Sequence, residues 1–207
     1  DTYGYRRINK ISIMKLSKDG QTVIGDKTKL NCDCLGVSGG WTPAVHLFTQ
    51  SGGKLKFREE DQVFIPDFYP SDQISIGSCN GDFSLEEIVR NTLFSIKKFL
   101  NIEISEYKTI EIISGLNLSK RNIWLLPSDK PIGKTKSFVD YQNDATSKDI
   151  KLALREGFRS IEHVKRYTTT GMGTDQGKLG NMHALGIISE TAGTKMGEHG
   201  TTTFRPP

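Results

Sequence analysis

A loop rich in threonine and glycine, TTTGMGTDQGK from Thr168 to Lys178, holds the residues of this 207-residue chain that are best suited to bind a ligand. Glycines let the backbone approach a ligand closely, and the N-terminus of the predicted helix that follows favours an anion. Cations flank the loop on both sides. The pattern is typical either of a phosphate site or of a tight turn between helices. The candidate phosphate contacts are Lys165, Arg166, Thr169, Thr170, Gly171 and Lys178.

The glycine spacing excludes a dinucleotide-binding fingerprint in this loop. Gly171-x-Gly173-x-x-x-Gly177 is one residue too long, and it follows a predicted helix where the fingerprint follows a strand. Two small-residue turns elsewhere follow strand-like runs, and each is either a nucleotide-binding turn or a tight exit from a strand. Their candidate contacts are Gly39 and Gly40 in the first turn and Gly77 in the second.

No catalytic set emerges from the remaining residues. The four histidines are scattered, and we interpret His163, which lies among basic residues, as structural. Cys32, Cys34 and Cys79 cannot all pair with one another, and no further metal ligands lie near them. We therefore predict reduced thiols, no metal and no catalytic residue, with the chemistry supplied by a cofactor.

The first hundred residues are predicted to be β-rich. Strands are expected at Ile11–Leu16, Thr22–Ile24, Lys29–Val37 and Gln73–Ile76, with a turn over Lys18–Gly20 and another over Ser38–Gly40. Ser84 and Glu87 have the spacing of a capping box, and they predict an amphipathic helix that runs to Leu100. A further strand is expected at Ile110–Ile113, and a domain boundary is expected near residues 101–120.

The last third is predicted to be helical. Thr146 and Asp149 form a second capping box, and Gly157 has the position of a C-terminal glycine after that helix. Ser160 caps a second short helix, and a third begins near Lys178–Asn181. Alternation of these elements with the strands upstream indicates an α/β or α+β fold.

Composition places the chain among ordinary globular proteins. Hydrophobic residues make up 35% and charged residues 25%, and the net charge of +4 is scattered along the chain. We therefore expect no nucleic-acid partner and no membrane span, and a cytoplasmic location. The start at Asp1 and the final TTTFRPP suggest a piece of a longer polypeptide.

Three strings together carry a family resemblance. FVDYQNDATSKDIKLALREGFRSIEHVKRYTTTGMGTDQGK, from Phe138 to Lys178, closely resembles the α subunit of heterotetrameric sarcosine oxidase. CDCLGVSGGWTPAVHLFTQSGGKL resembles the end of that family's dinucleotide-binding region, and GTTTFRPP resembles its passage into a folate-binding domain. The resemblance implies an FAD/NAD(P)-binding-type domain, of which the C-terminal part lies in residues 1–100. A linker over 101–136, a helical domain over 137–200 and a connection over 201–207 would follow it.

The helical domain resembles the small [2Fe–2S] domains of bacterioferritin-associated ferredoxins. The cysteine ligands of those domains correspond to Asp140, Gln142, Asp175 and Gly180 here. Iron–sulfur ligation needs thiolates, so the resemblance implies a ferredoxin-like fold without a cluster. Ser78 stands where the resemblance places the aspartate that contacts a flavin ribityl chain, which favours NAD over FAD in this domain.

The resemblance also implies a complex and its chemistry. The family's complex oxidises sarcosine at FAD in the β subunit, reduces oxygen to hydrogen peroxide through FMN held between α and β, and hands the one-carbon unit to tetrahydrofolate. It also contains γ and δ subunits. On this resemblance the Thr168–Lys178 loop contacts the FMN phosphate, and the chain itself is scaffold without turnover. The alternatives are a subunit of a related amine or proline dehydrogenase, a cyanide-forming glycine oxidase, or a structural adaptor.

Overall fold

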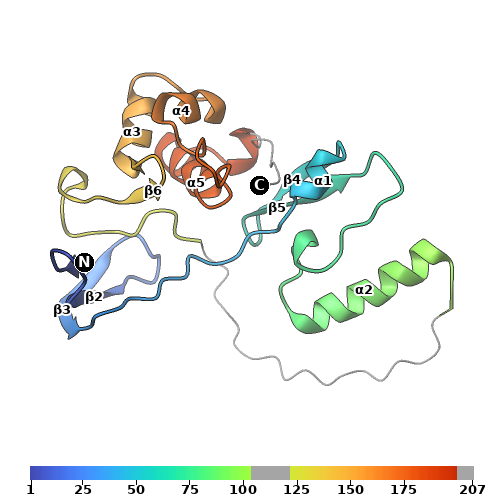
Figure 1. The fold of residues 1–207 in the computed structure, drawn as a ribbon, viewed down its shortest axis with the longest axis horizontal. Helices are drawn as coiled ribbons and strands as arrows, with labels where there is room; N and C mark the ends of the chain where they lie inside the picture. The colour runs from blue at the N-terminus through green and yellow to red at the C-terminus, as the bar shows by residue number, and fades with distance from the viewer. Residues whose placement is uncertain (104–121, 200–207) are drawn as a thin grey trace. The chain divides into compact units, whose positions relative to one another are not determined.

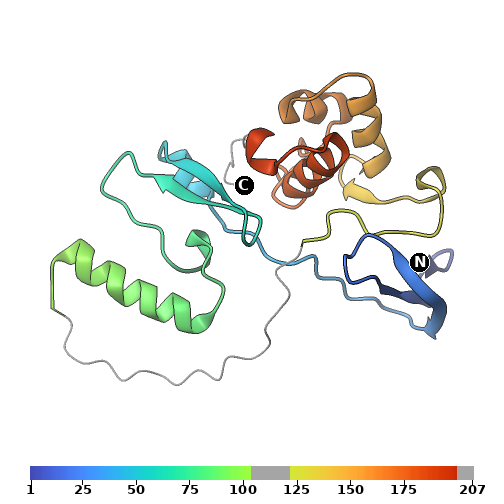
Figure 2. The same cartoon turned by 180° about the vertical axis from the view of Figure 1, so that it is seen from behind.

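The computed structural model describes residues 1–103 and 122–199, and it divides the chain into two compact units. Unit 1 comprises Asp1–Trp41 and Ile123–Ser137, and unit 2 comprises Thr42–Asn122 and Phe138–Pro207. Figures 1 and 2 show the elements of both units from opposite sides. The predicted strand at Ile110–Ile113 and the predicted connection over 201–207 lie outside the described residues.

Unit 1 is built on an antiparallel sheet of β1 (Thr2–Tyr3), β2 (Lys10–Leu16) and β3 (Val23–Asn31), in that spatial order. The predicted turn over Lys18–Gly20 joins β2 to β3, and Gly20 adopts a positive φ of 67° there. The 3₁₀ turn η2 (Ile132–Lys134) lies in the returning segment. That segment is tied to the sheet by the Lys27–Asp129 ion pair at 2.7 Å.

Two predicted strands are wrong. The stretch Lys29–Val37 is not a separate strand, because its first residues end β3 and Cys32 to Val37 are irregular. The reason is that β2 begins at Lys10, opposite Asn31, so only one further backbone bond, from Cys32 to the Asn9 carbonyl, extends the pairing. Gln73–Ile76 pairs with no strand among the described residues, and its last residue, Ile76, has an extended backbone. The predicted turn over Ser38–Gly40 is irregular chain.

Unit 2 begins with elements that the sequence patterns missed. Helix α1 (His46–Gln50) precedes a hairpin of β4 (Lys54–Arg58) and β5 (Val63–Phe68), whose Val63–Ile65 stretch is buried. The hairpin is joined to the 3₁₀ turn η1 (Gly77–Asn80) by one side chain. Arg58 binds the Asp61 carboxylate and donates to the Gly81 carbonyl at 2.8 Å.

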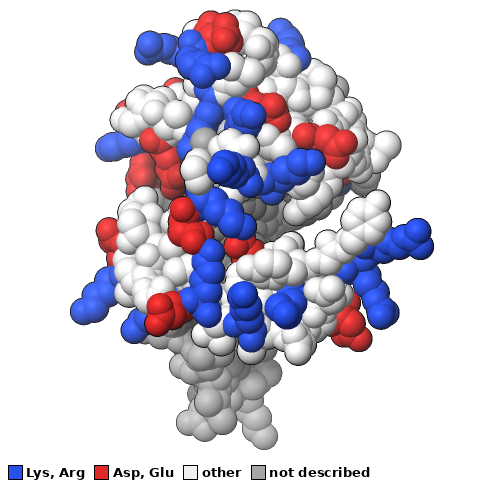
Figure 3. Space-filling model, turned by 90° about the vertical axis from the view of Figure 1, so that its left-hand side faces the viewer, with Lys and Arg blue, Asp and Glu red and all other residues white. Residues whose placement is uncertain are grey.

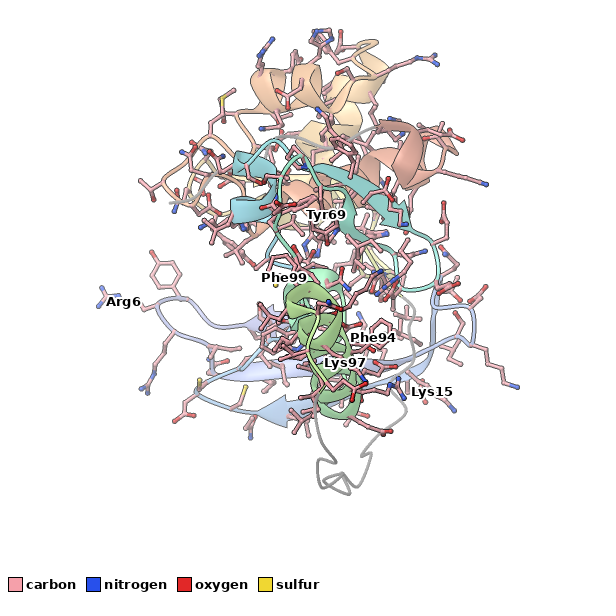
Figure 4. The ribbon with its side chains drawn as sticks, turned by 90° about the vertical axis from the view of Figure 1, so that its right-hand side faces the viewer. Arg6, Lys15, Tyr69, Phe94, Lys97 and Phe99 are labelled. Carbon is pink, nitrogen blue, oxygen red and sulfur yellow. The ribbon has the colours of Figure 1, made fainter. Side chains whose placement is uncertain are left out.

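Helix α2 (Leu85–Leu100) begins directly after Ser84, as predicted, but its capping box does not form. The Ser84 side chain makes no capping hydrogen bond, so the Ser84–Glu87 part of the prediction is wrong. No residue of α2 is fully buried within the described parts of the chain. Phe94 and Phe99 are 68% and 52% exposed, and Figure 4 shows them with Lys97 on this helix.

The C-terminal part of unit 2 is a small helical assembly. It contains β6 (Phe138–Asp140), β7 (Ala145–Thr146), α3 (Ser147–Arg155), α4 (Ile161–Thr168), α5 (Gly180–Ala192) and η3 (Met196–His199). The three helices pack together (Figures 1 and 2), and their shared core is formed by Ile150, Ala153, Val164, Ile187 and Ile188. The apolar spacing that predicted these helices therefore also selected their inward faces.

The helix boundaries in this part confirm the sequence prediction. The Asp149 carboxylate accepts hydrogen bonds from the Thr146 N–H at 2.8 Å and from the Thr146 hydroxyl at 2.6 Å, which fixes the start of α3. Gly157 follows α3 with a φ of 97°. Ser160 stands at the predicted N-cap position of α4, but its side chain makes no capping hydrogen bond. These local signals need no long-range partner, so the sequence alone locates them.

The described residues thus form a mixed α and β structure with small antiparallel sheets, as expected for an α+β arrangement. The hairpin and the helical assembly meet through η3. Gly197 lies against Phe57, where a Cβ on the glycine would sit 3.4 Å from the phenylalanine Cβ. The assignments of residues 1–100 to a dinucleotide-binding domain and of residues 137–200 to a ferredoxin-like domain stay predictions.

Candidate functional site

The Thr168–Lys178 loop starts where α4 unwinds into a left-handed residue. Thr169 is the C-cap of α4, with a φ of 58°, and its side chain is exposed. The Thr168 hydroxyl donates to the Val164 carbonyl at 2.8 Å and lies 2.7 Å from the Thr170 hydroxyl. Since Thr168 has already donated its proton, it accepts the one from Thr170. Two of the three consecutive hydroxyls therefore close the end of α4.

The carboxylate of Asp140 holds the middle of the loop. It accepts hydrogen bonds from the Gly171 N–H at 2.7 Å, the Gln142 N–H at 2.8 Å and the Asn143 N–H at 3.1 Å. The Asn143 side-chain amide donates to it as well, at 3.1 Å. Asp140 is only 5% exposed. Burial raises the pKa of Asp140, but the hydrogen bonds from Gly171, Asn143 and Gln142 outweigh it and hold that pKa below 3.8.

Gln142 holds the far half of the loop from the same turn. Its amide oxygen accepts from the Thr174 hydroxyl at 3.1 Å and lies 3.4 Å from the Asp175 backbone nitrogen, which donates to it. Asp175 in turn accepts from the Gly177 N–H at 3.1 Å. The short stretch 140–142 thus anchors two separate points of the loop.

Glycine is required at two loop positions because both pack against Asn181, in the first turn of α5. Gly171 and Gly177 have φ values of 72° and 75°, in the left-handed region. A Cβ on Gly171 would lie 2.1 Å from the Asn181 Oδ1, and one on Gly177 would lie 2.2 Å from the Asn181 Nδ2. The loop is therefore folded closely onto α5.

The candidate phosphate contacts fall into an outer group and an inner group. Thr169 and Arg166 are exposed, and Lys178 is half-buried near His46, whose pKa is lowered by burial and by the Lys178 charge. Lys165 lies 3.9 Å from the Glu162 carboxylate, with its side chain 15% exposed. In the inner group, Thr170 is fully buried and the Gly171 N–H is bound to Asp140. The inner pair builds the loop, and the outer residues face outward from it or lie at its edge.

The candidate nucleotide turns lie in different units. Gly39 and Gly40 belong to unit 1, in exposed irregular chain, and nothing lies within 4 Å of a Cβ built on Gly40. Gly77 belongs to unit 2, where it opens η1 with a φ of 70°. Their assignment to nucleotide-binding turns stays a prediction.

The structure brings together the four positions that correspond to cluster ligands in the resemblance. Gln142 binds the Asp175 backbone, and a Cβ on Gly180 would lie 3.8 Å from the Asp140 Cβ. That same Cβ would lie 2.9 Å from the Val139 carbonyl oxygen, which leaves no ordinary space for a side chain. Within residues 1–103 and 122–199, no group of three or more His, Cys, Asp or Glu side chains is arranged to hold a metal.

The charge distribution and the cysteines point to no other site. Figure 3 shows Lys and Arg side chains interspersed with Asp and Glu on one face of the molecule. Cys32, Cys34 and Cys79 are free thiols. Among the helices that the structure describes, none combines the length and apolar character needed to cross a bilayer.

A solved structure shares this fold. The chain aligns over its full length with 41% of the L-proline dehydrogenase from P. horikoshii, with a TM-score of 0.54 and 19% sequence identity. At this identity the likeness concerns the fold alone.

Sequence comparison then identifies the relatives. Residues 134–207 match the family model described as the sarcosine oxidase A3 domain. All of the chain is 33% identical to the sarcosine oxidase subunit alpha of Rhizobium meliloti, and 97% of it is 31% identical to that of Corynebacterium sp. strain P-1. The chain spans 22% and 21% of these two proteins. The resemblance to the sarcosine oxidase α subunit is therefore confirmed, for a chain about one fifth as long as these relatives.

Proposed function

We propose that this chain is a segment of the α subunit of a sarcosine-oxidising flavoenzyme, in which it serves as scaffold and forms one wall of an FMN phosphate site. The observation that carries the proposal is similarity to sarcosine oxidase α subunits over the entire chain. The name of these relatives implies partner subunits, and we propose that the site lies where α meets β, in an assembly with γ and δ.

The outer residues of the Thr168–Lys178 loop fit a phosphate group. Arg166 carries a planar set of donors and is exposed, as is Thr169, while Lys165 and Lys178 add positive charge. The Thr169 hydroxyl donates to the Thr168 carbonyl at 2.6 Å, so the donors to a phosphate would come from the guanidinium and the two ammonium groups. Thr170 is fully buried, and the Gly171 N–H is bound to Asp140. We therefore assign the phosphate to the outer residues and leave these two to shape the loop.

The proposed reaction of the complex is oxidative demethylation of sarcosine to glycine. FMN, when bound, supplies the transfer of electrons towards oxygen, which is reduced to hydrogen peroxide. Tetrahydrofolate, bound by a folate domain beyond this chain, would take up the one-carbon unit as 5,10-methylenetetrahydrofolate. FAD would be held by β and NAD by the complete dinucleotide-binding domain, to which Gly39, Gly40 and Gly77 would contribute turns.

The phosphate assignment is tested by removing charge from the loop in the assembled complex. Lys165→Ala combined with Lys178→Ala should lower FMN occupancy, measured by flavin absorbance per complex. The matched control is Lys148→Ala with Lys151→Ala, which removes the same charge from α3. If the loop variant holds as much FMN as the control, the phosphate assignment is wrong.

A second candidate is a subunit of an amine or proline dehydrogenase, which the shared fold with L-proline dehydrogenase favours. The two candidates differ in substrate and in electron acceptor. Steady-state assays of the assembled complex with sarcosine and with L-proline, each followed by oxygen consumption and by dye reduction, separate them. A structural adaptor would show neither flavin binding nor turnover in the same assays.

A further inference from the structure

Asp140 is a buried carboxylate whose hydrogen-bond partners lie both in the turn after β6 and in the Thr168–Lys178 loop. Its oxygens accept three backbone N–H groups and one side-chain amide, and one of the N–H groups belongs to Gly171, thirty-one positions along the chain. We propose that Asp140 is the positioning residue of the FMN phosphate site, an inference that rests on the proposed function above.

Asp140 is connected to the exposed Thr169 through a short series of hydrogen bonds and adjacent residues. Gly171 follows Thr170 directly, and Thr170 is locked to Thr168 through its hydroxyl and through its N–H at 3.3 Å. Thr169 lies between them, in a left-handed conformation that a non-glycine residue adopts only when its surroundings hold it. Fixing Gly171 therefore fixes the direction in which Thr169 points.

An ionised carboxylate at position 140 should anchor the loop better than a single neutral amide oxygen does. An Asn at position 140 retains one acceptor, but its amide nitrogen would replace the second oxygen, next to N–H donors that need an acceptor. The Gly171 N–H, whose bond to Asp140 is buried, would be left without an acceptor. Charge-assisted bonds are also roughly twice as strong as neutral ones. The loop would then lose the anchor at Gly171 while keeping the one that Gln142 makes at Thr174.

Asp140 also explains why the loop's own backbone does not receive the phosphate. The carboxylate already occupies the N–H groups of Gly171, Gln142 and Asn143, which together would otherwise form an anion-binding concavity. An external phosphate is thereby directed to the outer side of the loop, where Arg166 and Thr169 are exposed.

The test uses the assembled complex with its complete α subunit, stripped of FMN and titrated with FMN. Asp140→Asn is compared with Asp149→Asn. Asp149 also carries a hydrogen-bonded carboxylate, but it binds Thr146 at the start of α3, away from the loop. We expect Asp140→Asn to weaken FMN binding by at least about tenfold. Asp149→Asn should leave the FMN affinity within about twofold of the wild-type value. It should lower the unfolding temperature about as much as Asp140→Asn does.

The outcomes separate this proposal from the one on which it rests. If Asp140→Asn binds FMN as tightly as Asp149→Asn does, while Lys165→Ala with Lys178→Ala weakens binding, the positioning role is refuted and the phosphate assignment stands. If none of these variants alters FMN affinity, the phosphate assignment fails and the positioning role fails with it. Should Asp140→Asn not assemble, Asp140→Glu, which keeps the charge and moves it by one methylene, must weaken binding more than Asp149→Glu does.

Discussion

The buried carboxylate of Asp140 and the backbone N–H of Gly171 are joined by a 2.7 Å hydrogen bond, between the end of β6 and a loop thirty-one residues away. It links the two parts of unit 2 that the proposed phosphate site requires, the end of β6 and the end of α4. Asp140 is followed two residues later by Gln142, which binds the other half of the loop. The loop is thus ordered by side chains outside it.

The close approach of Gly171 to Asn181 makes an alanine there costly. Gly171→Ala adds a Cβ 2.1 Å from the Asn181 Oδ1 in addition to the strain of a left-handed alanine. Gly157→Ala is the matched control, because its φ is also positive but nothing lies within 4 Å of its Cβ. We expect backbone strain to lower the free energy of unfolding by about 1 kcal/mol in both variants. The clash with Asn181 should cost Gly171→Ala about 1–3 kcal/mol more. Chemical denaturation measures the difference, and equal losses would contradict the packing argument.

The ion pair of Arg58 should contribute more to stability than a surface pair does. Arg58 joins Asp61 to the Gly81 carbonyl, with its side chain 28% exposed, whereas the Lys56–Asp67 pair is about half exposed on both sides. We expect Arg58→Ala to cost about 1–3 kcal/mol and Lys56→Ala less than about 0.5 kcal/mol. Urea unfolding of the two variants is the measurement. A cost for Lys56→Ala that matches the cost for Arg58→Ala would show that the Gly81 contact adds nothing.

Truncation of a side chain in the helical core should lower the free energy of unfolding far more than truncation of an exposed side chain beside the loop. Ile188 is fully buried in α5, whereas Leu179, just before that helix, is 76% exposed. Ile188→Ala removes buried methyl groups and leaves a cavity, at a cost of about 2–5 kcal/mol. Leu179→Ala should change the free energy of unfolding by less than about 0.5 kcal/mol. Thermal unfolding followed by circular dichroism distinguishes these results, and a large effect of Leu179→Ala would contradict the exposed position of that side chain.

The capping carboxylate of α3 predicts an acid-dependent loss of stability. The hydrogen bond from the Thr146 hydroxyl lowers the pKa of Asp149 below 3.8, so the unfolded chain binds this proton more readily than the folded one. The stabilisation is therefore complete above about pH 4 and is lost as the pH falls through the lower, folded-state pKa. The stability difference between the wild-type chain and Asp149→Asn, about 1 kcal/mol at pH 7, should shrink below pH 4. If it persists unchanged at pH 2, the charge of Asp149 is not its source.

Local signals located the helices of the C-terminal part, because capping pairs and C-terminal glycines act within a few residues. Thr146 with Asp149 and Gly157 define α3 without any partner from elsewhere. Strands are harder to predict from the sequence, since a strand exists only where a second one pairs with it. Lys29–Val37 had the composition of a strand throughout, but its pairing ends at Asn31. The β4–β5 hairpin is not predicted from the sequence because its turn lacks a strong turn sequence.

The sequence by itself determined the family resemblance and the starts of the three helices within residues 146–192. It also singled out the Thr168–Lys178 loop as a candidate phosphate site, which stays a prediction. Only the tertiary structure decided which residues of that loop face outward. Thr169 and Thr170 are neighbours of the same type, yet one is exposed and the other fully buried. The physical reason is that Asp140 and Gln142 approach the loop from a turn about thirty residues earlier in the chain, while Asn181 packs against it from the first turn of α5. Their hydrogen bonds and close contacts hold the inner side of the loop, and Arg166 and Thr169 stay exposed.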